Sequence, residues 1–140
     1  MRVNGAELFC KQPDEGPSLV LMHGVGPDSR KLEPGFEDLV RDHRVIAYYR
    51  RGYGGSAKAP RTGGWHQHGE DAAALIHELG AAPAAIAGWS GGGIVALHVA
   101  AEHPDLVKAL GLAETGLPLP TLSSRRRQVT SRNDVAVPLS

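Results

Sequence analysis

The sequence predicts an α/β fold built on a mostly parallel sheet with flanking helices. Short apolar segments alternate with amphipathic segments of about ten residues, the pattern of strands joined by crossover helices. Several apolar segments run without polar interruption, as strands do when helices cover both faces of their sheet. Glycine is abundant, with 18 residues among 140, so many tight turns are expected.

Turn residues and apolar runs predict the elements of the first half of the chain. Asn4-Gly5 is a strong signal for a tight turn, so the N-terminal residues are predicted to form a hairpin. Ser18–Gly24 and His43–Tyr49 predict buried strands, and Pro34–Asp42 between them predicts a short helix. The Gly-, Pro- and Arg-rich segment after these strands is predicted to be a loop.

The second half continues the alternation. Glu70–Gly80 is predicted to be a helix because its apolar residues recur at helical spacing and Gly80 is a typical stop. Three elements follow, a strand, a helix that ends before Pro104 and a strand: Ala84–Gly88, Gly91–His103 and Leu106–Glu114.

Composition bounds the organisation of the chain. Residues 1–114 are predicted to form one partial domain, and residues 115–140, rich in Ser, Pro and Arg, a disordered or poorly packed tail. Lys+Arg and Asp+Glu are equal at 15 each, so no bulk charge favours nucleic acid or a membrane surface as a partner. Cys10 is the single cysteine, and the N-terminus lacks an apolar leader, so the cytoplasm is the expected location.

One serine lies among glycines at a junction between strand and helix. Gly88-Trp89-Ser90-Gly91-Gly92 fits the pattern G-x-S-x-G. A strand that turns at once into a helix forces its central residue to a positive φ and brings the residues two before and two after it together, so glycine is needed at both. The N–H of Gly91 would open the helix, where unpaired donors stabilise an oxyanion. An ordinary glycine-rich turn is the alternative; a nucleotide site is disfavoured because no phosphate-binding loop is present.

Two further motifs accompany this one and together suggest a family. Leu21–Gly24 (LMHG) ends the earlier apolar strand, and Tyr49–Ser56 (YRRGYGGS) follows the next. In order and spacing the three motifs resemble the α/β-hydrolase superfamily, nearest to small bacterial esterase-like and peroxidase-like members. The resemblance covers roughly Val3 to Glu114, about the first six strands, and therefore implies an incomplete α/β-hydrolase fold.

The resemblance implies roles for individual residues. Ser90 would be the nucleophile, the N–H groups of Val25 and Gly91 the oxyanion hole, and Trp89 part of the pocket wall. A small ester, lactone or amide would be cleaved through an acyl-serine, without a cofactor. His23 would support the loop before Val25 by bonding to backbone.

A general base is missing from this pattern. The family order is serine, acid, histidine, but only His98 and His103 follow Ser90, and both lie too far along the predicted helix to reach its hydroxyl. Glu114, at the end of the last strand, is a candidate acid; a polar strand end is the simpler interpretation. No triad histidine is therefore assigned, and the chain is interpreted as a truncated or frame-shifted, impaired serine hydrolase. A non-catalytic binding module of the same fold, or a gene remnant, is the alternative.

Two other features are predicted to have no catalytic role. His66 and His68 form an H-x-H pair beside Glu70, but the spacing is weak evidence for a metal, so they are interpreted as part of a polar loop and no metal site is predicted. Leu106–Leu112 is expected to be an exposed apolar edge strand that favours self-association. The expected partner is otherwise a small-molecule substrate.

Overall fold

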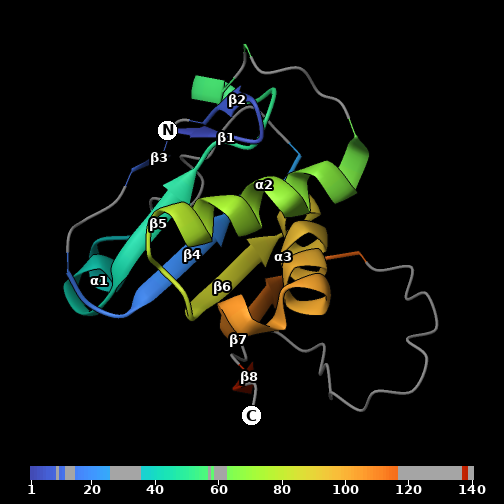
Figure 1. Ribbon diagram of the computed structural model, residues 1–140. Coiled ribbons are helices and arrows are strands. Elements are labelled where there is room, and N and C mark those ends of the chain that lie inside the picture. The colour runs from blue at the N-terminus through green and yellow to red at the C-terminus, as the bar shows by residue number, and fades with distance from the viewer. Residues whose placement is uncertain are drawn as a thin grey trace.

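A computed structural model describes residues 1–8, 10–11, 15–25, 36–56, 58, 63–116 and 137–138. Within them, one sheet has the strand order β3-β5-β4-β6-β7-β8, and a separate hairpin pairs β1 with β2 (Figure 1). The four middle strands are parallel: β5 (Arg44–Tyr48), β4 (Ser18–Met22), β6 (Ala84–Trp89) and β7 (Val107–Ala113). The predicted α/β fold with a parallel sheet is confirmed.

The remaining strands are short and antiparallel. β1 (Arg2–Val3) and β2 (Ala6–Glu7) form the hairpin predicted at Asn4-Gly5, where both turn residues have positive φ, as a type I′ turn requires. β3 (Cys10–Lys11) pairs with β5 at one edge of the large sheet, and β8 (Val137–Pro138) pairs with β7 at the other.

β8 corrects the prediction of an exposed edge. Ala109 and Leu110 of β7 pair with Pro138 and Val137, so the segment Leu106–Leu112 is covered there instead of open. The prediction did not include this pairing because it took residues 115–140 to form a disordered or poorly packed tail; for the rest of Leu106–Leu112 it stays a prediction. Residues 117–136 and 139–140 of that segment lie outside the described residues.

Three helices connect the parallel strands: α1 (Phe36–Asp42), α2 (Gly64–Glu78) and α3 (Gly91–Glu102). α2 lies across the sheet and packs against α3, as Figure 1 shows. α2 begins at Gly64, not at Glu70 as predicted, so His66 and His68 lie in a helix and not in a loop. The first turns of α2 hold few apolar residues, so apolar spacing alone did not predict them. His68 and Gly69 in these turns are nevertheless buried.

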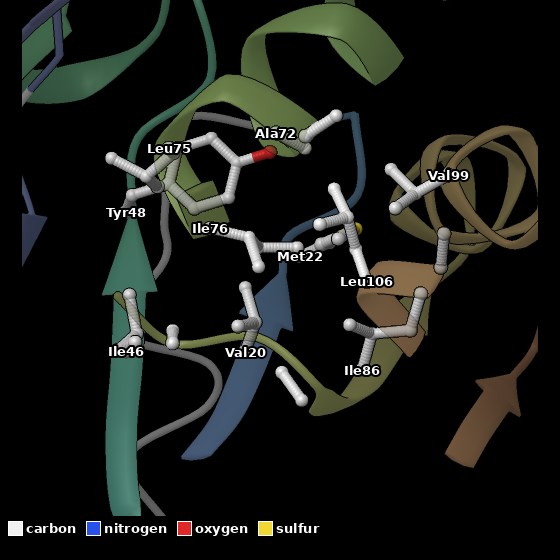
Figure 2. Close-up of a cluster of buried hydrophobic side chains, with 14 of the residues drawn as sticks. Val20, Met22, Ile46, Tyr48, Ala72, Leu75, Ile76, Ile86, Val99 and Leu106 are labelled. Carbon is white, nitrogen blue, oxygen red and sulfur yellow. The ribbon is translucent and has the colours of Figure 1, made fainter. Parts of the chain in front are cut away.

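The core lies between the sheet and helices α2 and α3. Val20, Ile46 and Ile86, one from each of three adjacent strands, are at most 1% exposed and belong to one cluster with Leu75 and Ile76 of α2 (Figure 2). Contact between the apolar side chains of strands and helices excludes water from this face of the sheet. Such burial of apolar surface is the main contribution to the stability of a domain of this type.

Strand order determines where a ligand site is expected. After β4 the chain moves to β5 on one side and then returns to β6 on the other side of β4. At such a reversal the connections leave in opposite directions, so a crevice is expected at the carboxyl ends of the two strands. Those ends carry His23-Gly24 after β4 and Ser90 after β6.

Candidate active site

Ser90 lies at a sharp kink between β6 and α3. Its backbone has φ 51° and ψ −120°, a combination that costs a residue with a side chain about 1–3 kcal/mol. The Ser90 N–H donates to the carbonyl of Ala113 at 2.9 Å, and its carbonyl accepts from the Gly93 N–H at 3.0 Å, so both sides of the kink are held. The residue is exposed, and its hydroxyl lies at the carboxyl edge of the sheet.

Glycines allow the backbone to close around this kink. A Cβ added at Gly88 would collide with the carbonyl of Gly92, and one added at Gly92 would collide with the carbonyl of Met22. A Cβ at Gly24 would lie 3.0 Å from the Ser90 Cβ. These three positions let α3 start directly beside β4 and let the loop after β4 lie against Ser90.

The peptide between Gly24 and Val25 is held by two donors. The Gly24 carbonyl accepts from His23 Nδ1 at 2.8 Å and from Arg50 Nη2 at 2.7 Å. In a trans peptide the N–H points opposite to the carbonyl. The Val25 N–H therefore points away from His23 and Arg50. Val25 itself is 68% exposed, and its side chain lies next to Gly91, the first residue of α3.

His23 is buried and has both ring nitrogens bonded to backbone groups. Nε2 accepts from the Arg50 N–H at 2.9 Å, so Nδ1 carries the proton that it donates to Gly24. Burial, together with the positive charge of Arg50, lowers the pKa of His23 to about 4. The expected support of the loop through backbone bonds is observed, and the nitrogen that could act as a base is already an acceptor.

A group of rings beside the site was not assigned a role from the sequence. The guanidinium of Arg50 lies 4.7 Å from the centroid of the Tyr53 ring and 5.5 Å from that of Trp65. Trp65 also lies against Gly91, and the His68 ring is near both aromatic rings. Arg50 and Tyr53 belong to the motif Tyr49–Ser56, which was the available signal; nothing in the sequence pointed to Trp65.

The other candidate residues occupy separate places. Glu114, the candidate acid, accepts a hydrogen bond from Trp89 Nε1 at 2.8 Å and is exposed. His98 and His103 each have Nε2 3.0 Å from Oε1 of Glu70. The structure thus brings Ser90, Gly24-Val25 and Gly91 together and leaves both histidines that follow Ser90 on the side of α3 that faces α2.

Comparison with known proteins matches most of the chain to one family. A family model described as the alpha/beta hydrolase fold matches residues 17–135. The chain is 36% identical over 111 residues to the pimeloyl-[acyl-carrier protein] methyl ester esterase of Chromobacterium violaceum, a match that covers 77% of this chain and 41% of that one. The chain spans less than half the length of the curated relatives it matches.

Solved structures give the same picture. The enol-lactonase of Burkholderia xenovorans superposes with a TM-score of 0.70 and 30% identity, over 76% of this chain and 42% of that one. A thermophilic esterase of Thermogutta terrifontis superposes with a TM-score of 0.74 and 29% identity, over 82% of this chain and 43% of that one. Among the described residues, no helix has both the length and the apolar character needed to cross a membrane.

Proposed function

The chain belongs to the α/β-hydrolase fold family, and we propose that it carries the nucleophile half of a serine hydrolase acting on a small ester or lactone. The observation that supports this proposal is the exposed hydroxyl of Ser90 on a strained backbone at φ 51°. Strain of this kind persists where the surrounding structure holds it, and it is concentrated at functional sites. An esterase and an enol-lactonase among the similar proteins support the substrate class.

The proposed reaction starts with attack of Ser90 Oγ on the carbonyl carbon of the substrate. A new C–O bond forms, the carbonyl oxygen takes the electron pair of its double bond, and the serine proton leaves. The oxyanion is stabilised by the N–H of Gly91, which opens α3 and has no acceptor within its own helix, and by the N–H of Val25. The tetrahedral intermediate then re-forms the C=O bond and breaks the C–O bond to the alkoxy group, which takes a proton from water. An ester thus releases an alcohol, whereas the new hydroxyl group of a lactone stays attached to the acyl-serine.

Removal of the proton from the Ser90 hydroxyl limits the rate of the proposed reaction in this chain. His23 already accepts from the Arg50 N–H, and His98 and His103 both contact Glu70, so none of the three serves Ser90 as a base. With none of these three histidines as the base, we expect the proton to pass to solvent and acylation to be slow. We infer that the base belongs to the part of the relatives' length that this chain does not span, and that its acid partner lies there too unless Glu114 takes that role. Glu114 remains the candidate acid within the chain.

Labelling with a fluorophosphonate tests the role of Ser90. The probe forms a covalent bond with the hydroxyl of a serine held beside oxyanion donors, so slow labelling that reaches one label per chain is expected, located at Ser90 by peptide mass spectrometry. Ser90→Ala removes the label. Ser18→Ala is the matched control, because Ser18 lies at the start of β4, at the opposite edge of the sheet, and labelling stays unchanged. Folded protein that takes up no label, or labelling that survives Ser90→Ala, would contradict the proposal and favour a non-catalytic binding module.

A second pair of variants tests the oxyanion donors. Val25→Pro removes the N–H at this position, and Val25→Ala keeps it. Loss of one oxyanion donor lowers the rate of acyl transfer by about 10²–10³-fold. The labelling rate is therefore expected to fall by about that factor in Val25→Pro and to stay close to the original in Val25→Ala. Equal rates in the two variants would remove Val25 from the proposed site.

A further inference from the structure

Four polar side chains gather where α2 packs on α3, away from Ser90. His66 and Glu70 come from α2, His98 from α3, and His103 directly follows α3. His98 Nε2 and His103 Nε2 both lie 3.0 Å from Glu70 Oε1, and the rings of His66 and His98 meet edge to face at 5.0 Å. The side chains of Glu70, His98 and His103 are between 18% and 35% exposed, so solutes reach the cluster from water.

The backbone is shaped to bring these groups together. His66 and Glu70 are four residues apart on one helix, the spacing that places two side chains on the same face. Between them, Gly69 makes room for His98, since a Cβ at this position would collide with the imidazole ring. A glycine inside a helix destabilises it by about 1 kcal/mol relative to alanine. Gly69 therefore lowers the helix propensity of α2 at the point where the imidazole of His98 approaches it.

We propose that His66, Glu70 and His98 bind one transition-metal dication of the zinc class, with His103 holding the Glu70 carboxylate. One ligand atom from each of the three residues lies within 4.8 Å of the others. Ligands on a tetrahedral zinc ion lie about 3.4 Å apart, so the site closes by a small rotation of the His66 ring, which is exposed and free of the core. A fourth position remains for water.

The donor set decides which ions fit. Imidazole nitrogens suit Zn²⁺, Co²⁺, Ni²⁺ and Cu²⁺, whereas Mg²⁺ and Ca²⁺ require a shell of oxygen ligands. Glu70 Oε1 lies 3.0 Å from both His98 Nε2 and His103 Nε2, so a carboxylate oxygen already faces an imidazole nitrogen where the ion would be held.

The proposed site differs from the H-x-H pair in the sequence, and it does not depend on the proposed function. His66 and His68 are two residues apart on a helix and therefore point to different sides. His68 faces the rings of Tyr53 and Trp65, while His66 faces His98. The partner of His66 in the metal site comes from the next helix, 32 positions along the chain, and spacing in the sequence did not reveal it.

Titration of the untagged 140-residue chain with metal tests the site. Calorimetry with ZnCl₂ is expected to give one ion per chain, with a rise in the melting temperature that EDTA reverses, because the ion ties α2 to α3. Co²⁺ is expected to give the visible absorption of a tetrahedral ion, and Mg²⁺ no heat. All titrations use the Cys10→Ser background, which removes the single thiol as a competing ligand.

Three variants assign the ligands. His66→Ala changes an exposed side chain and is expected to leave the circular dichroism spectrum unchanged while affinity falls by more than about tenfold. Glu70→Gln is expected to lower affinity similarly, and His103→Ala by about tenfold, the effect of losing a group that orients a ligand. His77→Ala is the control, since this histidine is on the same helix with 79% of its side chain exposed. Absence of zinc binding, or binding that both His66→Ala and Glu70→Gln leave intact, would show a hydrogen-bonded cluster only.

Discussion

The buried polar side chain of one residue, His23, holds the loop next to Ser90. The neutral form of His23 donates through Nδ1 and accepts through Nε2, and both partners are backbone groups. A second proton on Nε2 would face the N–H of Arg50 and would place two positive charges side by side. The lowered pKa of His23, about 4, follows from this geometry as well as from burial.

His23 therefore makes stability depend on pH. Below its ordinary pKa of 6.5 the unfolded chain takes up a proton at His23, while the folded chain does not until pH falls to about 4. Stability at this site is thus complete above pH 6.5 and is lost between pH 6.5 and 4. Compared with His23→Asn, the advantage of the native chain in unfolding free energy is expected to shrink by about 2–3 kcal/mol from pH 7 to pH 4.5.

Urea denaturation at a series of pH values measures this difference. Taking native chain minus variant cancels the contribution of the carboxylates, which titrate in both proteins. His77→Ala serves as control, because 79% of the His77 side chain is exposed and its ring lies outside the core. A difference between the native chain and His23→Asn that stays constant over this range would show that His23 is not held neutral.

Sequence patterns predicted the turn at Ser90 better than its surroundings. The glycines at 88 and 92 are required by local backbone geometry, which a short motif records completely. Arg50 and Trp65 meet beside Gly91 because the end of β5 and the start of α2 lie at the same edge of the sheet. That juxtaposition depends on tertiary packing, so no spacing within the sequence predicts it.

At the scale of elements, the start of α2 shows where apolar periodicity fails. Its second half was predicted because Leu75 and Ile76 recur with other apolar residues at helical spacing. The first half instead uses polar side chains for internal contacts: Gln67 donates to Asp71 one turn later, at 2.9 Å. A pattern that counts only apolar residues cannot distinguish such a turn from a loop.

Asp71 connects three elements through one buried carboxylate. It accepts two hydrogen bonds from Arg51 at 2.8 Å each and one from Asn4 at 3.1 Å, so α2, the loop after β5 and the β1–β2 hairpin meet there. Asp71 is 1% exposed and Arg51 is 5% exposed. The paired carboxylate raises the pKa of the Arg51 guanidinium, which therefore stays charged.

Removal of this carboxylate is expected to be strongly destabilising. Asp71→Asn leaves the Arg51 charge buried without its counter-ion, and loss of one partner of a buried pair costs about 3–5 kcal/mol. Urea denaturation followed by circular dichroism measures the loss. The double variant Arg51→Met/Asp71→Leu is expected to recover much of it, since no buried charge remains. Glu78→Gln, on the exposed face of the same helix, is the control; equal losses at 71 and 78 would contradict the argument.

At the scale of the whole molecule, the middle strands of the sheet are paired on both sides, whereas its edges are formed by short strands. β4 and β6 each have parallel neighbours on both sides, whereas β7 pairs beyond β6 only with β8 among the described residues. The parallel order could be predicted because strands and helices alternate locally. The pairing of β7 with β8 could not, because Val137–Pro138 is a two-residue strand within a segment without periodicity.

We expect β8, which consists of Val137 and Pro138, to keep the chain from associating through β7. Deletion of residues 137–140 removes β8 and frees the backbone groups at Ala109 and Leu110. Unpaired groups on an apolar edge strand form a template for a second chain, so larger species are expected in size-exclusion chromatography with light scattering. Deletion of residues 139–140 alone keeps β8 and is expected to retain the mass of the full chain. If the two deletions gave the same mass distribution, β8 would not be the element that protects β7, and the edge would have to be covered by other residues.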